Sequence, residues 1–288
     1  MDRTAYEDCR QFARTSFGDI AYVERGQGPA AVFCHGAVLN GYQWRDVIDR
    51  CAEVRRVIAF DNLGHGRTTA APDAGVDFDA HARMISELLD GLGAEKVDLV
   101  GNDSGGAIAQ FFAARNPDRV RSLALANCDA RDSTAPPGLL PLLEVVRQGG
   151  LADMWKFMLD NPDQARLPET LGGLYEHPEN VADATIEEYL APVVADMSTL
   201  HTLERFLLAL ADDQMRAIEP QLRELQAPTL IAWGNADPTF DLEHAHWLAE
   251  TIPGARPVVE IEGGKLFWPE EHPDRLAELL VEHWSAAE

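Results

Sequence analysis

A buried strand that runs directly into a tight turn constrains this chain more than any other feature. Residues 97–100 are Val-Asp-Leu-Val, and residues 101–105 are Gly-Asn-Asp-Ser-Gly. Small residues at both ends of the turn allow the sharp, strained backbone that joins a strand to a helix in this way. The side chain at its centre, Asp103, is then held above a sheet, where a carboxylate can attack an sp3 carbon.

Strands and helices alternate around this turn. Apolar runs at 30–34, 56–61 and 120–126 predict buried strands. Amphipathic spacing at 78–92 and a small, apolar stretch at 104–115 predict helices. This alternation indicates an α/β fold with a largely parallel, doubly wound sheet.

The alternation stops in the second half of the chain and resumes with an apolar run at 228–234. Between 133 and 212 there are prolines, glycines and helical patterns without a convincing strand. We therefore predict a core made of 1–132 and 213–288, with 133–212 as a helical cap over the carboxyl ends of the strands, where such sheets bind ligands. Near the start, 12–25 predicts a hairpin that turns at Gly18-Asp19.

The charge balance argues against nucleic acid and anionic membranes as partners. Lysine and arginine number 24 against 48 aspartates and glutamates, which gives a formal net charge of −24. We see no signal segment and no window near the roughly 18 apolar residues that a membrane span needs. Four scattered cysteines without a CxxC pair predict a reducing, cytoplasmic setting and no metal site. We expect a monomer or homodimer that acts on a small molecule without a cofactor.

Three motifs, in this order and spacing, resemble the α/β-hydrolase superfamily across essentially the whole chain. His35-Gly36 follows a strand like the oxyanion loop, 101–105 is similar to the nucleophile elbow, and 233–237, Trp-Gly-Asn-Ala-Asp, is similar to the segment that often supplies an acid. The resemblance implies the α/β-hydrolase fold with an inserted cap. An aspartate in the elbow, with 42–45 reading Tyr-Gln-Trp-Arg, resembles the haloalkane and haloacetate dehalogenases and the epoxide hydrolases.

In that branch the resemblance implies that the aspartate forms an alkyl ester, which a histidine-activated water then hydrolyses. Asp103 is favoured over Ser104 as nucleophile, because the serine register would place Asn102 where the turn wants glycine. The expected oxyanion hole consists of the backbone N–H groups of Ala37 and Ser104. Asp237 is the favoured acid partner, and Asp129, just after the strand at 120–126, is the alternative.

The expected histidine is replaced. Aligned on its neighbours Phe267 and 270–273, the position where the superfamily carries this base is Leu266. General-base help is worth roughly 10²–10⁴-fold in rate, so ester hydrolysis is expected to be slow without it. The cap histidines His201 and His177 are possible substitutes, while His272 is expected to face solvent. Alternatively Asp129 or Asp237 acts on water, or Asp103 is itself a base and no ester forms.

The side of the site that receives the leaving group is also unlike that of the dehalogenases, since Ala37 and Ser104 stand where asparagine and tryptophan often donate to halide. Asn40, Trp44 or Asn127 could take over that role. Tyr175 and Tyr189 lie in the predicted cap, where epoxide hydrolases use tyrosines as acids. The residues predicted to line the substrate site are His35, Asn40, Trp44, Asn127, Tyr189, His201, Leu266 and Phe267.

These observations favour a cofactor-independent enzyme that uses Asp103 on a small apolar electrophile, in the manner of a dehalogenase or an epoxide hydrolase. Lyase or isomerase chemistry with Asp103 as a base is the enzymatic alternative. A catalytically degenerate ligand-binding protein is the non-enzymatic one, and a serine esterase using Ser104 is a minor one.

Overall fold

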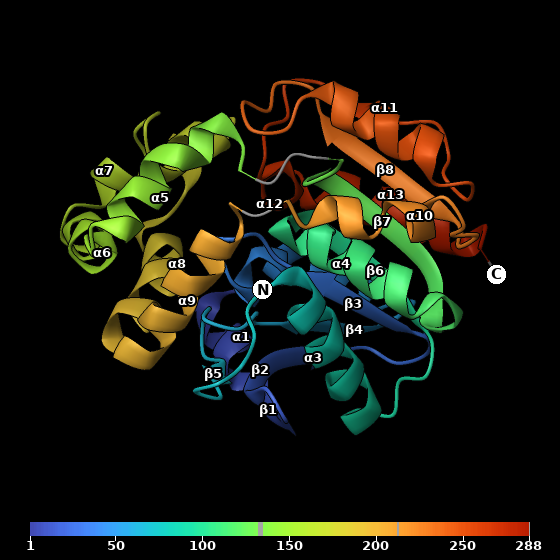
Figure 1. Ribbon diagram of the computed structural model, residues 1–288, viewed down its shortest axis with the longest axis horizontal. Coiled ribbons are helices and arrows are strands. Elements are labelled where there is room, and N and C mark those ends of the chain that lie inside the picture. The colour runs from blue at the N-terminus through green and yellow to red at the C-terminus, as the bar shows by residue number, and fades with distance from the viewer. Residues whose placement is uncertain (132–134, 212, 288) are drawn as a thin grey trace.

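One mixed sheet runs through the middle of the molecule (Figure 1). The structure is a computed structural model, and it describes residues 1–131, 135–211 and 213–287. Within these ranges nine strands form the sheet in the order β1-β2-β4-β3-β6-β7-β8-β9, with β5 pairing β2. The strands are β1 (Arg10–Thr15), β2 (Gly18–Arg25), β3 (Ala30–Cys34), β4 (Arg56–Phe60), β5 (Thr69–Ala70), β6 (Val97–Asp103), β7 (Val120–Cys128), β8 (Thr229–Gly234) and β9 (Val259–Ile261).

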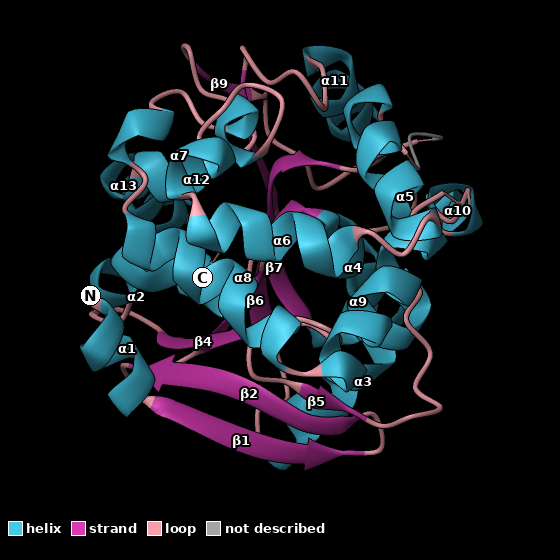
Figure 2. Ribbon diagram, turned by 90° about the vertical axis from the view of Figure 1, so that its left-hand side faces the viewer, coloured by secondary structure: helices cyan, strands magenta, loops and turns pink. Residues whose placement is uncertain are grey.

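Six neighbouring strands of the sheet are parallel to one another, namely β4, β3, β6, β7, β8 and β9. The strands β1, β2 and β5 are antiparallel to their neighbours. Every residue of β3, β6 and β8 is buried, because helices cover both faces of a parallel sheet. Two pairs of helices supply this cover, α3 (Phe78–Gly91) with α4 (Ser104–Arg115) on one face and α2 (Arg45–Cys51) with α13 (Pro273–Ser285) on the other (Figure 2). The predicted doubly wound α/β fold is confirmed.

The remaining core helices are α1 (Arg3–Asp8), α10 (Glu219–Leu222), α11 (Leu242–Thr251) and α12 (Trp268–Glu271). From 135 to 211 the described residues form helices and turns without a strand. The α-helices there are α5 (Leu140–Arg147), α6 (Leu151–Asp160), α7 (Pro162–Ala165), α8 (Asp183–Ala195) and α9 (Met197–Ala209), and we call this segment the cap. Its predicted boundaries at 132/133 and 212/213 fall on residues outside the described ranges. None of the helices described is long and apolar enough to cross a membrane.

The first hairpin turns two residues earlier than predicted. β1 ends at Thr15, whose hydroxyl donates to the Gly18 carbonyl and accepts from the Phe17 N–H, both at 3.1 Å. Gly18 does not turn the chain but begins β2, with a φ of 132°. A Cβ atom there would lie 2.0 Å from the Thr69 carbonyl oxygen of β5, so the glycine is required by a close strand contact instead of by the turn.

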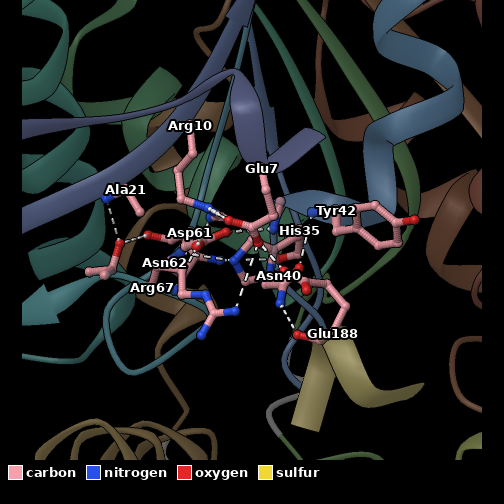
Figure 3. A network of polar contacts seen from close by, with 12 residues as sticks. Glu7, Arg10, Ala21, His35, Asn40, Tyr42, Asp61, Asn62, Arg67 and Glu188 are labelled. Carbon is pink, nitrogen blue, oxygen red and sulfur yellow. Dashed lines mark hydrogen bonds and ion pairs between the residues drawn. The ribbon is translucent and has the colours of Figure 1, made fainter. Parts of the chain in front are cut away.

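Buried ion pairs fasten the cap to the core at α8 (Figure 3). Arg10 of β1 pairs with Glu7 at 2.9 Å, with Asp61 at 2.9 Å and with Glu188 of α8 at 3.2 Å. Arg3 also pairs with Glu188, at 2.9 Å. Arg10, Asp61 and Glu188 are out of water, so each of these three charges depends on its partners to remain buried.

A second group of buried contacts joins the cap to the core through Tyr175 and through Tyr189, the residue next to Glu188 in α8. Glu270 of α12 accepts hydrogen bonds from the hydroxyls of Tyr175 at 2.7 Å and Tyr189 at 2.8 Å, and it pairs with Arg45 of α2. Both tyrosines belong to the cap, whereas Glu270 and Arg45 belong to the core. The cap and core therefore share two groups of buried polar contacts, which meet α8 at the adjacent residues Glu188 and Tyr189.

Candidate active site

Asp103 lies at the junction of β6 and α4 with a φ of 56°, in the left-handed region that a non-glycine residue rarely adopts. The glycines on either side make the turn possible. A Cβ atom on Gly101 would lie 2.5 Å from the Gly105 carbonyl oxygen, and one on Gly105 would lie 2.2 Å from the Cys34 carbonyl oxygen. The strained turn predicted from 101–105 is thus present, and strain of this kind persists only where the surroundings enforce it.

The Asp103 carboxylate is held by backbone donors. The Ala37 N–H donates to Oδ2 at 2.8 Å, and the Ser104 N–H also hydrogen-bonds the carboxylate. These are the two groups that the sequence predicted for an oxyanion hole, and they act here on the aspartate itself. The Ser104 hydroxyl is buried and has no hydrogen-bond partner among the described residues, which leaves it without a base.

Gly36 leaves room for this arrangement. A Cβ atom at position 36 would lie 2.6 Å from Oδ2 of Asp103. We expect Gly36→Ala to slow alkylation of Asp103 by about 10²-fold, because small displacements of reacting groups are costly. The free energy of unfolding should fall by about 1–3 kcal/mol from overpacking. Intact-protein mass against time and urea denaturation would measure both, and Gly91→Ala, where nothing lies within 4 Å of the new Cβ, is the control. Equal behaviour of the two variants would contradict the prediction.

Three carboxyl groups lie near one another at the ends of β6, β7 and β8. Burial raises the pKa of Asp103 to about 7, while its two backbone hydrogen bonds act in the opposite direction. Burial also raises the pKa of Asp237 to about 6, against hydrogen bonds that include the Thr239 N–H. Burial, and then the charge of Asp103, raise the pKa of Asp129 well above its ordinary value. Burial therefore favours the protonated forms of these three carboxyl groups.

Asn127 fixes the orientation of Asp237. Its Nδ2 donates to Oδ2 of Asp237 at 2.8 Å and to the Gly234 carbonyl at 3.1 Å. Its Oδ1 accepts from the Gly234 N–H at 2.7 Å and from the Trp268 indole at 2.9 Å. Both amide hydrogens are occupied, so Asn127 has none left for a leaving group, and we assign it a positioning role instead of the predicted substrate contact.

A cavity of about 670 Å³ lies between the core and the cap. Asp103, Asp129, Ala37 and Leu266 line it from the core. Most of the remaining lining is apolar and comes from the cap and from the segment after β8, including Leu139, Leu142, Val145, Met154, Trp155, Met158, Leu174 and Phe240. A concave, mostly apolar space with a few converging polar groups is the ordinary form of a small-molecule site.

The position predicted to replace the histidine lies in this cavity. Leu266 is 2% exposed, and its carbonyl accepts from Asn102 Nδ2 at 2.9 Å. No histidine is found among the described residues that line the cavity. His201 of α9 and His177 are exposed and lie outside the lining. His272 was predicted to face solvent, but it is only partly exposed and pairs with Glu176 at 3.0 Å.

Several residues predicted to contact substrate lie elsewhere. His35 accepts from the Asn62 N–H at Nε2, at 2.8 Å, so its Nδ1 carries the proton and donates to the Gly36 carbonyl. Trp44 is fully buried against Phe33, outside the cavity lining.

Asn40 is fully buried as well, where it donates to the Glu188 carbonyl and accepts from the Tyr42 N–H. Tyr189 is occupied by Glu270, and Phe267 packs on Tyr175. We therefore leave His35, Asn40, Trp44, Tyr189, His201 and Phe267 out of the proposed substrate contacts.

Sequence reasoning missed much of the lining. Trp155, Met154 and Met158 enter from α6, and Lys265 and Glu169 are the further ionisable residues of the described lining. The spacing of Met154 and Met158 signals one helix face, but this spacing does not show whether the face meets the core, another cap helix or a cavity.

Comparisons with known proteins agree with this architecture. The family model of the alpha/beta hydrolase fold matches residues 29–271. The chain is 30% identical over 265 residues to the soluble epoxide hydrolase of Corynebacterium sp. (strain C12), with 88% of each protein covered. It is 27% identical over 285 residues to haloalkane dehalogenase 2 of Mycobacterium tuberculosis (strain ATCC 25618 / H37Rv), covering 94% of this chain and 93% of that protein.

A solved structure of the epoxide hydrolase CorEH without ligand has the same fold, with a TM-score of 0.80 at 21% identity over 97% of this chain and 99% of that one. The family model covers most of the chain, and the match to these two relatives extends over 93% and 88% of their length. The chain belongs to the alpha/beta hydrolase family.

Proposed function

We propose that this protein is an enzyme in which Asp103 attacks an electrophilic sp3 carbon of a small apolar molecule and forms an alkyl ester. The observation that carries the proposal is the Asp103 carboxylate itself, which lines an apolar cavity with one oxygen, Oδ2, held by the Ala37 N–H. The relatives named as a dehalogenase and an epoxide hydrolase support this class of chemistry.

The hydrogen-bonding pattern favours attack by the other oxygen, Oδ1. When Oδ1 bonds to carbon, the leaving group departs with the electron pair, and Oδ2 becomes the carbonyl oxygen of the ester. Water that later attacks Cγ would place negative charge on Oδ2. The Ala37 N–H already donates to this atom and the Ser104 N–H hydrogen-bonds the same carboxyl group, so these preorganised donors would stabilise the charge that develops there.

Intact-protein mass spectrometry tests the proposal. The protein is incubated with 1-bromohexane or with 1,2-epoxyhexane, and the mass is followed with time. A gain equal to the alkyl group, mapped by peptide sequencing to Asp103, or turnover that Asp103→Asn abolishes, supports the proposal. Absence of both with either compound would overturn it.

The pH dependence of alkylation follows from the ionisation of Asp103. Its pKa is raised to about 7 by burial, and only the ionised carboxyl is a good nucleophile. The rate with 1-bromohexane should therefore rise about tenfold per pH unit below 7 and level off above about 8. Adduct formation measured from pH 5.5 to 9 would show this profile. A rate that does not change over this range would contradict it.

A further inference from the structure

We infer that Asp129 is the acid and then the base of this site, so that an epoxide is converted to a diol whereas a haloalkane is arrested as the Asp103 ester. This inference rests on the proposed function and adds to it the substrate class and the group that does the work of the absent histidine. The role is distinct from that of Asp237, which accepts a hydrogen bond from Asn127 and is not among the described lining residues.

The strand register places the two aspartates side by side. Asp103 at the end of β6 pairs with Cys128 at the end of β7, and Asp129 is the next residue. Asp129 is 3% exposed, and both carboxyl groups line the same cavity. Its backbone carbonyl accepts from Gln110 Nε2 at 2.8 Å, which ties this residue to α4.

The surroundings of Asp129 favour its neutral form. Burial and the charge of Asp103 both raise its pKa, against a hydrogen bond from its own backbone N–H that acts in the opposite direction, and within the described ranges no cation is found in an ion pair with it. The titratable groups near it are the Asp103 carboxylate from β6 and Cys128 on its own strand, and the partly exposed Lys265 and exposed Glu169 line the same cavity. Two carboxyl groups this close in an apolar space cannot both ionise readily, so one of them keeps a proton.

An epoxide uses that proton. Oδ1 of Asp103 bonds to a ring carbon, the ring C–O bond breaks, and its electron pair stays on the oxygen, which takes the proton of Asp129 and becomes a hydroxyl. Asp129 is now a carboxylate and takes a proton from water as the water oxygen bonds to Cγ of the ester. When the bond from Cγ to the alkyl oxygen breaks, that oxygen takes the proton of the new Asp103 carboxyl. A diol leaves, and both aspartates regain their starting forms.

A haloalkane does not complete this cycle. The halide departs with the bonding electron pair and needs no proton, so Asp129 keeps its own, which burial favours even after the Asp103 charge is lost, and it cannot accept a proton from water. Leu266 cannot accept one either. The ester therefore persists, although the first chemical step is the same. One molecule thus hydrolyses the first substrate and is inactivated by the second.

The two compounds of matched length, 1,2-epoxyhexane and 1-bromohexane, separate these outcomes in the intact protein. For the wild type we expect hexanediol with little accumulated adduct from the epoxide, and a persistent hexyl adduct from the bromide. Asp129→Asn should slow opening of the epoxide by about 10²–10³-fold and change alkylation by the bromide less than about threefold. Asp129→Glu should restore part of the epoxide rate. The pH at which this rate falls, as the carboxyl loses its proton, should shift to follow the pKa of the glutamate.

Asp118→Asn is the matched control, since Asp118 is an exposed aspartate at the opposite end of β7. Thermal unfolding of each variant excludes misfolding as the cause of a lost rate. If Asp129→Asn slows the reactions of both compounds equally, or slows neither, the inference is overturned. Adducts on Asp103 would still leave the proposed function standing. Rapid wild-type hydrolysis of the hexyl ester would also overturn it. Failure of both compounds to react would overturn the proposed function itself.

Discussion

Asp103→Asn is expected to abolish alkylation and, at pH 8, to make the protein more stable. The amide oxygen is a poor nucleophile, so the rate should fall on the order of 10⁴-fold or more, as when other enzymes lose a nucleophile. The substitution keeps the shape of the side chain and preserves an oxygen that can accept from the Ala37 N–H. Loss of the rate would therefore reflect chemistry and not a displaced loop.

The gain in stability comes from removing a buried charge. The pKa of Asp103 is about 7 in the folded protein against an ordinary value of 3.8, so the folded state binds this proton more tightly than the unfolded state does. Stability is consequently lost as the pH rises from about 4 to about 7. A shift of this size corresponds to at most about 4 kcal/mol, and we expect Asp103→Asn to recover about 2–4 kcal/mol at pH 8 and less at pH 5.5.

Urea denaturation at the two pH values measures this gain, with Asp118→Asn as the exposed control that should change the free energy of unfolding by less than about 0.5 kcal/mol. A variant that is less stable than the wild type at pH 8 would show that the charged Asp103 is well accommodated. Asparagine and aspartate both tolerate a positive φ, so the φ of 56° at position 103 is expected to cost the same in both proteins.

Leu266→His is expected to release the ester that 1-bromohexane leaves on Asp103. Leu266 and Asp103 line the same cavity, and an imidazole at position 266 could take a proton from water in the second step. Hydrolysis of the adduct should accelerate by about 10²-fold or more. The measurement is the decay of the adduct mass after excess 1-bromohexane is removed. With the histidine side chain as the base, the decay rate should rise with pH through about 6.5.

Leu266→Asn is the control for this prediction, because it introduces a polar side chain of similar size that cannot act as a base at neutral pH. Both variants place a polar group where a buried leucine stood, and each should lose about 1–3 kcal/mol of stability. Equal decay of the adduct in the two variants would show that access of water, and not the missing base, limits hydrolysis.

The fold and the elbow could be predicted because their signals are local. Strands buried on both faces produce apolar runs such as 97–100, and the turn at 101–105 needs small residues at fixed offsets. The Ala37 and Ser104 donors are backbone groups, so their positions follow from the chain path. The predicted position of the first turn was wrong by two residues. Gly18 is required by its close contact with β5, a short strand without a sequence signal of its own.

The side-chain contacts of the site could not be predicted in this way. Asn127 and Trp44 are residue types that often bind ligands, yet the first is occupied by Asp237 and Gly234 and the second fills the core beside Phe33. Whether such a side chain contacts a ligand or the protein core depends on how separate elements pack together. The lining from α6 is invisible for the same reason, since an amphipathic pattern reports burial without naming the neighbour.

The buried charges between cap and core have a consequence for how such proteins can be recombined. Glu188 belongs to the cap while Arg3 and Arg10 belong to the first two elements of the core, and Glu270 and Arg45 of the core serve two cap tyrosines. A cap transplanted alone would lose the buried pair of Arg10 and Glu188, at a cost of about 3–5 kcal/mol. The cap is thus not an interchangeable module, and a functional chimera would have to inherit the amino-terminal segment and α12 along with it.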